Sequence, residues 1–369
     1  MAITIIQQPT TPNCTYTNLV YEVSSSRSTD PQFQYIMDVY VSGSVDRLAR
    51  VRQFPNQYNK AVFDPSRIFN DNMEYVKDFT NNYLLTGSTQ VRDFSVEFGE
   101  EFGTSVTSSV VISASLATDI IQVFPCQIDP NNGTSYNYLD SASAVILSDR
   151  PNNFTEYQNV NDRFAVYNGT GINQDITWTY SAGLGGPYTE TVTPGEFEMV
   201  KSPVQNQSSG TVTITFGSDT IIKNYEAACD EPVYNFHFIN KYGMFENFST
   251  NRPARINTNV TRQDYTQTFV NYGGNNPGYD VTRRGKGNFN TSLLDSYTIS
   301  TNWLNQTEAD WITQLIESDE VYLAVSPNNS VFKPIVITNT TYQQHTNRKD
   351  QKMFMYDITF EYANQRRGR

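Results

Sequence analysis

Histidine is the side chain best suited to acid–base chemistry at neutral pH, and this 369-residue chain has only two, His237 and His345. A catalytic histidine needs a nucleophile or an orienting acid close to it in space. On a strand, the same-face neighbours of His237 are Asn235 and Ile239, and no G-x-S-x-G nucleophile motif occurs in the chain. We therefore interpret His237 as a half-buried strand residue and His345 as a turn residue.

The three cysteines, Cys14, Cys126 and Cys229, are scattered along the sequence and form no C-x-x-C pair. Zinc sites and disulfide frameworks use recurrent cysteine spacings, which this chain lacks. The sequence therefore predicts no metal site, no disulfide framework and no cofactor. So few cysteines also fit a protein that assembles in a reducing cytoplasm.

The carboxylates form no recognisable catalytic pair. Glu100 and Glu101 are adjacent, so on a strand they face opposite sides of the sheet. Asp319 and Glu320 follow a predicted helix, where we expect them to be solvated. The segment DPNNG at residues 129–133 lacks the ligand spacing of an EF-hand and is interpreted as a turn. We therefore predict that the chain is not an enzyme and has no catalytic, cofactor-binding or metal-ligating residue.

Two basic segments are candidates for contacts with other molecules. The glycine-rich stretch RRGKG at 283–287 matches neither a P-loop nor a dinucleotide-binding motif, so a loop or hairpin is the simpler interpretation. The chain ends in a second basic segment, QRRGR. The three cations of RRGKG could also contact phosphate, whereas the terminal arginines can contact an acidic neighbouring subunit or remain solvated. The candidate subunit contacts are Arg283, Arg284, Lys286, Arg366, Arg367 and Arg369.

Composition excludes several classes of protein. The net charge is −12, whereas proteins that bind specific nucleic-acid sequences are usually basic. No apolar run approaches the length of a membrane span, and the N-terminal residues do not read as a secretion signal, so we expect no membrane insertion. Aromatic residues make up 13% of the chain beside many Asn, Ser and Thr residues, which is typical of β-rich proteins.

The sequence divides into three predicted domains. Residues 1–127 read as a β-rich domain with one helix. Apolar residues alternate along the strand at 33–41, Asp64 can cap the helix, and Pro65 fits its first position. Residues 128–228 alternate short apolar runs with turns, as in a small β-sandwich.

Residues 229–369 read as a C-terminal β domain with one helix. Thr307 and Asp310 resemble the capping box of that helix, and apolar residues alternate cleanly from Phe354 to Tyr362. The predicted fold is mainly β, with two or three β-sandwich-like domains and two short α-helices.

Both ends of the chain resemble a known family. The run FQYIMDVYVSGSVDRLARVRQFPNQYNKAVFDPSRIF, with its F-x-Y-x-x-D-x-Y-V strand, resembles virion structural proteins of the neck and tail of tailed bacteriophages that infect Bacteroidetes, including crAss-like phages. FHFINKYGMFENFS, WITQLIESDEVYL, KPIVIT and YDITFEYAN resemble the same group. The resemblance covers the first and last thirds of the chain, and it implies a virion component without transferring any catalytic residue.

The resemblance implies a protein that assembles in the host cytoplasm into a ring or sleeve of the virion. Its expected partners are copies of itself and portal, neck or tail components. If its acidic residues line a lumen, they would repel DNA and let it slide. Two alternatives stay open: a receptor- or glycan-binding tail or adhesin module, with aromatic residues near Tyr272 and Tyr279, and a tail-associated glycan hydrolase with two facing carboxylates.

Overall fold

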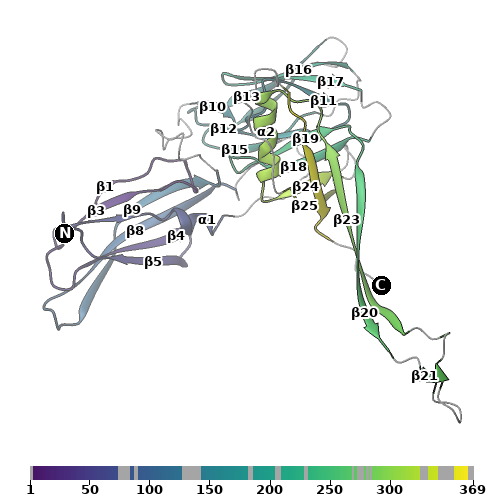
Figure 1. Ribbon diagram of the computed structural model, residues 1–369. Helices are drawn as coiled ribbons and strands as arrows, with labels where there is room; N and C mark the ends of the chain where they lie inside the picture. The colour runs from purple at the N-terminus through teal and green to yellow at the C-terminus, as the bar shows by residue number, and fades with distance from the viewer. Residues whose placement is uncertain are drawn as a thin grey trace.

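The computed structural model describes residues 3–73, 84–86, 90–126, 143–181, 186–203, 209–227, 232–267, 270–271, 278–279, 282, 285–324, 331–339 and 353–364. The fold is mainly β, as predicted, with two α-helices among the described residues. The described residues form two β-sandwiches and a third sheet that is covered by a helix. Figure 1 shows the N-terminal sandwich beside the middle sandwich, with a long hairpin leaving the C-terminal sheet on the opposite side.

The N-terminal sandwich contains a three-stranded and a five-stranded sheet. The smaller sheet has the order β1 (Thr4–Gln7), β3 (Tyr21–Ser24) and β6 (Lys60–Phe63). The larger sheet has the order β2 (Asn13–Cys14), β9 (Val110–Phe124), β8 (Arg92–Gly103), β4 (Gln34–Val41) and β5 (Arg47–Gln53).

Alternating apolar residues make the core between these two sheets. Tyr35, Met37 and Val39 of β4 are fully buried against Tyr21 and Phe63 of the smaller sheet. The period-two pattern in the sequence predicted this face of β4, because successive strand residues point to opposite sides. That expectation is confirmed.

Helix α1 (Ser66–Asn70) is shorter than the apolar stripe suggested. The N-cap is Pro65 and not Asp64 as predicted, so the helix begins one residue later than expected. The carboxylate of Asp64 still accepts hydrogen bonds from the backbone N–H groups of Ser66 and Leu19, at 3.0 and 3.1 Å. Phe69 is fully buried and stacks on Phe94, with ring centroids 4.5 Å apart. The predicted stripe extends to residue 76, which lies outside the described residues.

The middle sandwich includes one strand, β7, from residues 1–127, which the sequence assigned to the N-terminal domain. Its four-stranded sheet has the order β10 (Ala144–Ile146), β12 (Arg163–Asn168), β15 (Phe197–Lys201) and β7 (Leu84–Thr86). Its five-stranded sheet has the order β11 (Asn153–Tyr157), β17 (Asp219–Glu226), β16 (Ser209–Phe216), β13 (Gln174–Tyr180) and β14 (Tyr188–Val192). Because β7 pairs with β15, the two sandwiches do not divide at a single point in the chain.

The C-terminal region is a seven-stranded sheet covered by one helix. Its order is β19 (Phe245–Thr250), β18 (Tyr234–Ile239), β24 (Val321–Ala324), β25 (Phe332–Ile337), β26 (Asp357–Tyr362), β23 (Lys286–Ser300) and β20 (Arg255–Thr266). A small pair, β21 (Val270–Asn271) and β22 (Gly278–Tyr279), lies beyond β20. The predicted alternation in the last strand is confirmed, because Phe354, Tyr356, Ile358 and Phe360 are buried in one core.

The capping box of helix α2 (Gln306–Glu317) lies two residues before the position predicted from the sequence. The Asn305 side chain accepts from the backbone N–H of Glu308, and the Glu308 carboxylate accepts from the backbone N–H of Asn305, both at 2.9 Å. The box therefore uses Asn305 and Glu308 instead of Thr307 and Asp310. The apolar face of α2, including Trp311 and Leu315, packs on the sheet as its helical spacing predicted.

All three parts of the fold meet around the turn between β18 and β19. A small core there contains side chains from each part, including Phe124, Tyr167 and Met244. Gly243 has a φ of +72°, and a Cβ at this position would lie 2.0 Å from the carbonyl oxygen of Pro125. Only glycine therefore allows the turn to approach the end of β9 this closely.

A disulfide joins Cys14 and Cys126 beside this junction, although the sequence predicted no disulfide. The two residues are 112 positions apart. They meet because β2 pairs in parallel with the end of β9, which places Cys14 opposite Phe124, two residues before Cys126. Because the two cysteines are so far apart in the sequence, no short cysteine-spacing motif indicates their disulfide.

Candidate functional site

His237 is a buried strand residue, more deeply buried than predicted. Its side chain has no exposed surface, and its ring lies edge-on to Phe332 with centroids 4.8 Å apart. Its Nε2 lies 3.1 Å from the side-chain nitrogen of Asn235. Burial, reinforced by the charge of Arg163, lowers the pKa of His237 to about 3, so the ring is neutral at physiological pH. The other histidine, His345, lies outside the described residues.

The adjacent acids also have separate structural partners. Glu100 accepts a hydrogen bond from the Ser25 hydroxyl at 2.7 Å, whereas Glu101 accepts from Arg52 at 2.8 Å across the sheet surface. Glu320 accepts from the Tyr322 hydroxyl. The described ranges contain no group of three or more His, Cys, Asp or Glu side chains placed to hold a metal ion. Residues 129–133, which the sequence predicted to form a turn, lie outside those ranges. Neither described helix has the length and apolar character of a membrane span.

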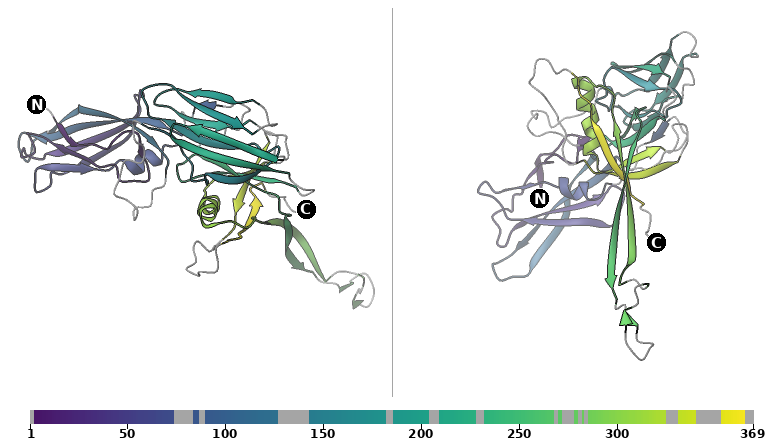
Figure 2. Two further views of the ribbon diagram at one scale, coloured as in Figure 1. Left: turned by 90° about the horizontal axis from the view of Figure 1, so that it is seen from above. Right: turned by 45° about the vertical axis from the view of Figure 1, so that its right-hand side comes forward.

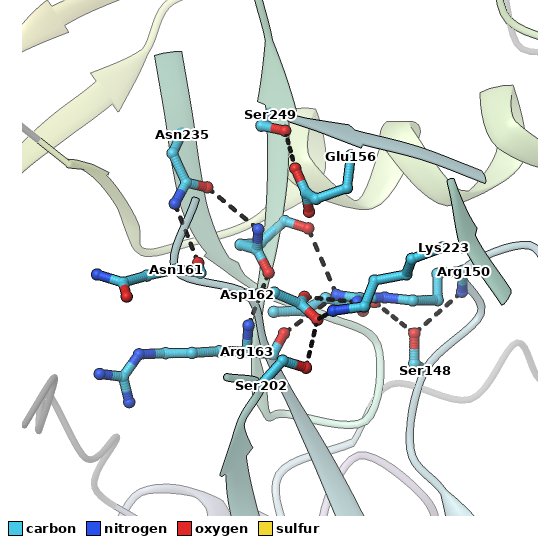
Figure 3. A network of polar contacts seen from close by, with 12 residues as sticks. Ser148, Arg150, Glu156, Asn161, Asp162, Arg163, Ser202, Lys223, Asn235 and Ser249 are labelled. Atoms are coloured by element: carbon cyan, nitrogen blue, oxygen red, sulfur yellow. Dashed lines mark hydrogen bonds and ion pairs between the residues drawn. The ribbon is translucent and has the colours of Figure 1, made fainter. Parts of the chain in front are cut away.

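The strongest charge arrangement was not predicted from the sequence. Arg150, Asp162, Lys223 and Glu246, which we call the charge cluster, lie between the middle sandwich and the C-terminal sheet (Figure 3). Arg150 is 2.7 Å from Asp162 and 2.8 Å from Glu246, and Lys223 pairs with the other oxygen of Asp162. The four side chains are at most 2% exposed, so a substrate cannot reach them.

The electrostatics of the charge cluster favour its ionised form. Burial alone would raise the pKa of Asp162, but the charges of Arg150 and Lys223 outweigh this effect and hold the pKa below its usual value. Burial likewise disfavours the Arg150 cation, yet the charges of Asp162 and Glu246 raise its pKa above that of a free guanidinium. The two cations and the two anions therefore neutralise one another in the protein interior.

The charge cluster also covers the edge of the C-terminal sheet. Strand β19 is the first strand of that sheet, so one side of its backbone has no neighbouring strand. The Arg163 backbone N–H donates to the Asn247 side chain at 2.8 Å, and the Arg150 guanidinium reaches the Asn247 carbonyl at 3.5 Å. Covering an edge in this way prevents unwanted strand pairing. We conclude that the cluster joins two domains.

Two further buried acids have altered proton affinity. Burial, followed by the charge of Asp162, raises the pKa of Glu156, which accepts a hydrogen bond from Ser249. Burial and the neighbouring Glu196 raise the pKa of Glu198 to about 7. Glu198 lies on β15, in the middle sandwich.

The exposed counterpart of the charge cluster is the hairpin formed by β20 and β23, which we call the arm. All twelve residues of β20 are exposed, and they pair with β23 from Arg255 opposite Thr298 to Thr266 opposite Lys286. At about 3.4 Å per residue, β20 spans about 40 Å. Figure 2 shows from two further directions that the arm leaves the body without lying against it.

The arm contributes little to its own stability. A two-stranded ribbon with no buried face is marginal in water. Strand β23 pairs with β26 only from Ser296 to Ser300, and β20 is the last strand of the sheet, so most of the arm has two unpaired edges. An element with this much unpaired backbone is suited to binding another molecule.

The structure places one of the six predicted contact cations. Lys286 lies on the arm, opposite Thr266, and forms an ion pair with Asp264 at 2.5 Å while its side chain remains 70% exposed. The other five lie outside the described residues: Arg283, Arg284, Arg366, Arg367 and Arg369. Two further cations that the sequence analysis did not single out, Arg255 and Arg262, are exposed on β20.

No family model matches the chain, and no curated protein matches it. Several solved structures are weakly similar, and two of them are described here. The polymeric Ig receptor ectodomain of a teleost fish is 6% identical, with 61% of this chain and 97% of that chain covered at a TM-score of 0.17. The I9–I11 tandem of titin is 12% identical, with 80% and 93% covered at a TM-score of 0.16. Likenesses this weak carry no argument about function.

Proposed function

We propose that this chain is a structural virion protein of a tailed bacteriophage, which assembles into a ring or sleeve of the neck or tail and joins neighbouring virion components. The arm is the observation that carries the proposal. It is a long ribbon with an exposed strand and unpaired edges, and it reaches a core only at its base, where Ile299 is buried and Tyr297 packs beside it. Such an element gains stability when it binds another molecule.

The rest of the molecule supports the same role. The charge cluster and the three-part core around Gly243 hold the domains together, so a contact made by the arm is connected to all three parts of the fold. Contacts that use different surfaces on the two partners build closed rings when the rotation between copies closes. The resemblance of the first and last thirds of the chain to neck and tail proteins agrees with this architecture.

The test compares the full chain with a variant whose arm is shortened. Residues 261–292 are replaced by a two-residue Asn-Gly turn, which suits a tight hairpin. Light scattering gives the mass in solution, and negative-stain images of the same sample give the symmetry. We expect the full chain to form rings or stacks at micromolar concentration and the shortened chain to remain monomeric. A full chain that stays monomeric in the presence of purified neck and tail components would contradict the proposal.

One observation favours a second candidate, glycan or receptor binding. A cavity of about 380 Å³ lies at the root of the arm and is lined by Tyr297, Tyr362, Lys333 and Leu293, among others. Aromatic rings beside a few polar groups are typical of small-ligand sites. A glycan array probed with the wild type and with Tyr362→Ala tests this candidate, because binding through the cavity requires a signal that the variant loses.

A further inference from the structure

Strand β20 is a long strand with one free edge. It stands last in the seven-stranded sheet, and β23 is its only neighbouring strand among the described residues. Its twelve residues contain no proline and are all exposed. Figures 1 and 2 show the arm directed away from the body, so the body does not cover this edge. Free backbone N–H and C=O groups along such an edge are a template on which another strand can pair.

The other free edge of the arm, on β23, is interrupted by a β-bulge. Gln263 pairs with Asn290 and the next residue, Asp264, pairs with Asn288, so Phe289 is an extra residue in β23. A bulge in an edge strand disturbs its ladder and hinders pairing with a further strand. On β20, each residue from Arg255 to Thr266 has its own partner in β23. The edge of β20 is therefore the side of the arm that is suited to strand pairing.

The charges of β20 favour a second copy of the same strand as its partner. The strand carries three charged residues, Arg255, Arg262 and Asp264. In an antiparallel pair with a two-fold axis, opposite side chains share a face of the sheet, so even-numbered residues meet even-numbered ones. One register places Arg262 of each copy opposite Asp264 of the other, with Gln263 on the axis. In every other two-fold register, Asp264 meets an uncharged residue of β20, a second Asp264, or no residue of β20 at all.

Both charged side chains are accessible to a neighbouring strand. Arg262 is exposed and forms no ion pair within the described ranges. Asp264 is 37% exposed, and its Oδ2 pairs with Lys286 at 2.5 Å, which leaves Oδ1 to accept from a second cation. Arg262 and Asp264 are two residues apart on one strand, so they project from the same face of the arm.

We propose that β20 of one molecule pairs antiparallel with β20 of a second copy, around a two-fold axis at Gln263. Residues 260–266 of the two strands then form a ladder, and the two arms become one four-stranded sheet with an Arg262–Asp264 contact on each side of the axis. This inference rests on the proposed function, because it names the partner of the arm. A two-fold contact uses the same surface on both copies and yields a pair, which is the unit that builds the ring or sleeve.

Charge reversal in the full chain tests the register. Arg262→Asp places two acids opposite one another at each contact, and Asp264→Arg places two cations there. Each variant should weaken self-association at least about tenfold, measured by light scattering over a concentration series, and salt should weaken the association of the wild type. Arg255→Asp is the matched control: it makes the same change on the same strand, outside residues 260–266, and should associate as the wild type does.

A mixture of the two variants gives the sharpest test. The Arg262→Asp chain carries acids at both positions, and the Asp264→Arg chain carries cations at both. The mixture should therefore form heterodimers with about the affinity of the wild type, although neither chain associates well alone. The double variant Arg262→Asp/Asp264→Arg exchanges the two charges within one sequence and should also associate as the wild type does.

The inference and the proposed function fail in different ways. If shortening the arm abolishes assembly but both reversals leave it intact, the edge of β20 is the wrong surface and the assembly role of the arm stands. If the reversals weaken association and neither the mixture nor the double variant restores it, the two-fold register is overturned. An equal loss in Arg255→Asp would also overturn the register, because the effect would then come from the charge of the whole arm. If the arm-shortened chain still assembles, the role of the arm itself is wrong.

Discussion

The charge cluster and the arm are both polar, and they differ in what surrounds their charges. In the cluster, two cations and two anions neutralise one another out of contact with water. On the arm, Arg255 and Arg262 face solvent along a fully exposed strand. The charge cluster fixes how two domains meet, because loss of one partner would leave a buried charge unpaired. The exposed arginines of the arm remain available to bind another molecule.

The largest expected effect comes from removing one buried charge. Arg150→Met keeps much of the side-chain volume but leaves Asp162 and Glu246 without their shared cation. We expect a loss of about 3–5 kcal/mol of unfolding free energy. Denaturant unfolding measures this loss. The same change on the arm, Arg262→Met, is the matched control and should alter stability by less than about 0.5 kcal/mol. Equal effects at the two sites would break the comparison.

Loss of the disulfide should have the next largest effect. Cys14→Ser opens a loop that spans 112 residues. We expect a loss of about 2–4 kcal/mol, measured by denaturant unfolding without reductant. The wild type in the presence of dithiothreitol should reproduce the loss, and the variant should not respond to reductant. An identical unfolding curve for the wild type with and without reductant would show that the bond does not form in solution.

The buried titrating groups predict opposite pH dependences. The folded-state pKa of His237, about 3, is below the unfolded value of 6.5, so the unfolded chain binds more protons between these pH values. Stability from this group is therefore lost as pH falls below 6.5, by about 2 kcal/mol between pH 7 and pH 5. Because glutamine does not titrate, the unfolding free energy of His237→Gln should rise relative to that of the wild type by the same amount as pH falls from 7 to 5.

Glu198 provides the internal contrast. Its folded-state pKa of about 7 is above the unfolded value of 4.5, so the folded chain binds more protons between the two. Stability from this group is lost as pH rises through that interval. Relative to the wild type, Glu198→Gln should gain stability as pH rises from 5 to 7, opposite in sign to His237→Gln. If the stability of both variants relative to the wild type changed in the same direction with pH, the pKa shifts assigned to His237 and Glu198 would be contradicted.

The smallest expected effect is on the stability of the body when the arm is shortened. Because the arm buries almost no apolar surface, replacing residues 261–292 by a tight turn should shift the unfolding free energy by less than about 0.5 kcal/mol. The measurement is made on dilute monomer, so that assembly does not contribute. A large loss would mean that the arm supports the C-terminal sheet, which would weaken its assignment as a binding element.

Local patterns in the sequence predicted most of the elements. Alternation identified β4 and β26, and helical spacing identified α2, although its cap lies at Asn305 because that side chain and Glu308 satisfy each other's backbone N–H groups. The contacts between distant segments were not predictable. Arg150 and Glu246 are 96 residues apart, and nothing in their flanking residues marks them as partners. The arm was read only as strands, because periodicity does not report whether a strand leaves the body.

The position of β7 has a consequence for proteolysis. The chain passes from β6 in the N-terminal sandwich to β7 in the middle sandwich, returns to β8 and β9, and then enters β10. It therefore crosses between the two sandwiches at three points in the described topology. A protease that cuts at one crossing leaves two covalent connections, so both fragments should co-purify as one particle. A fragment that begins at residue 128 lacks β7 and exposes the edge of β15 to aggregation.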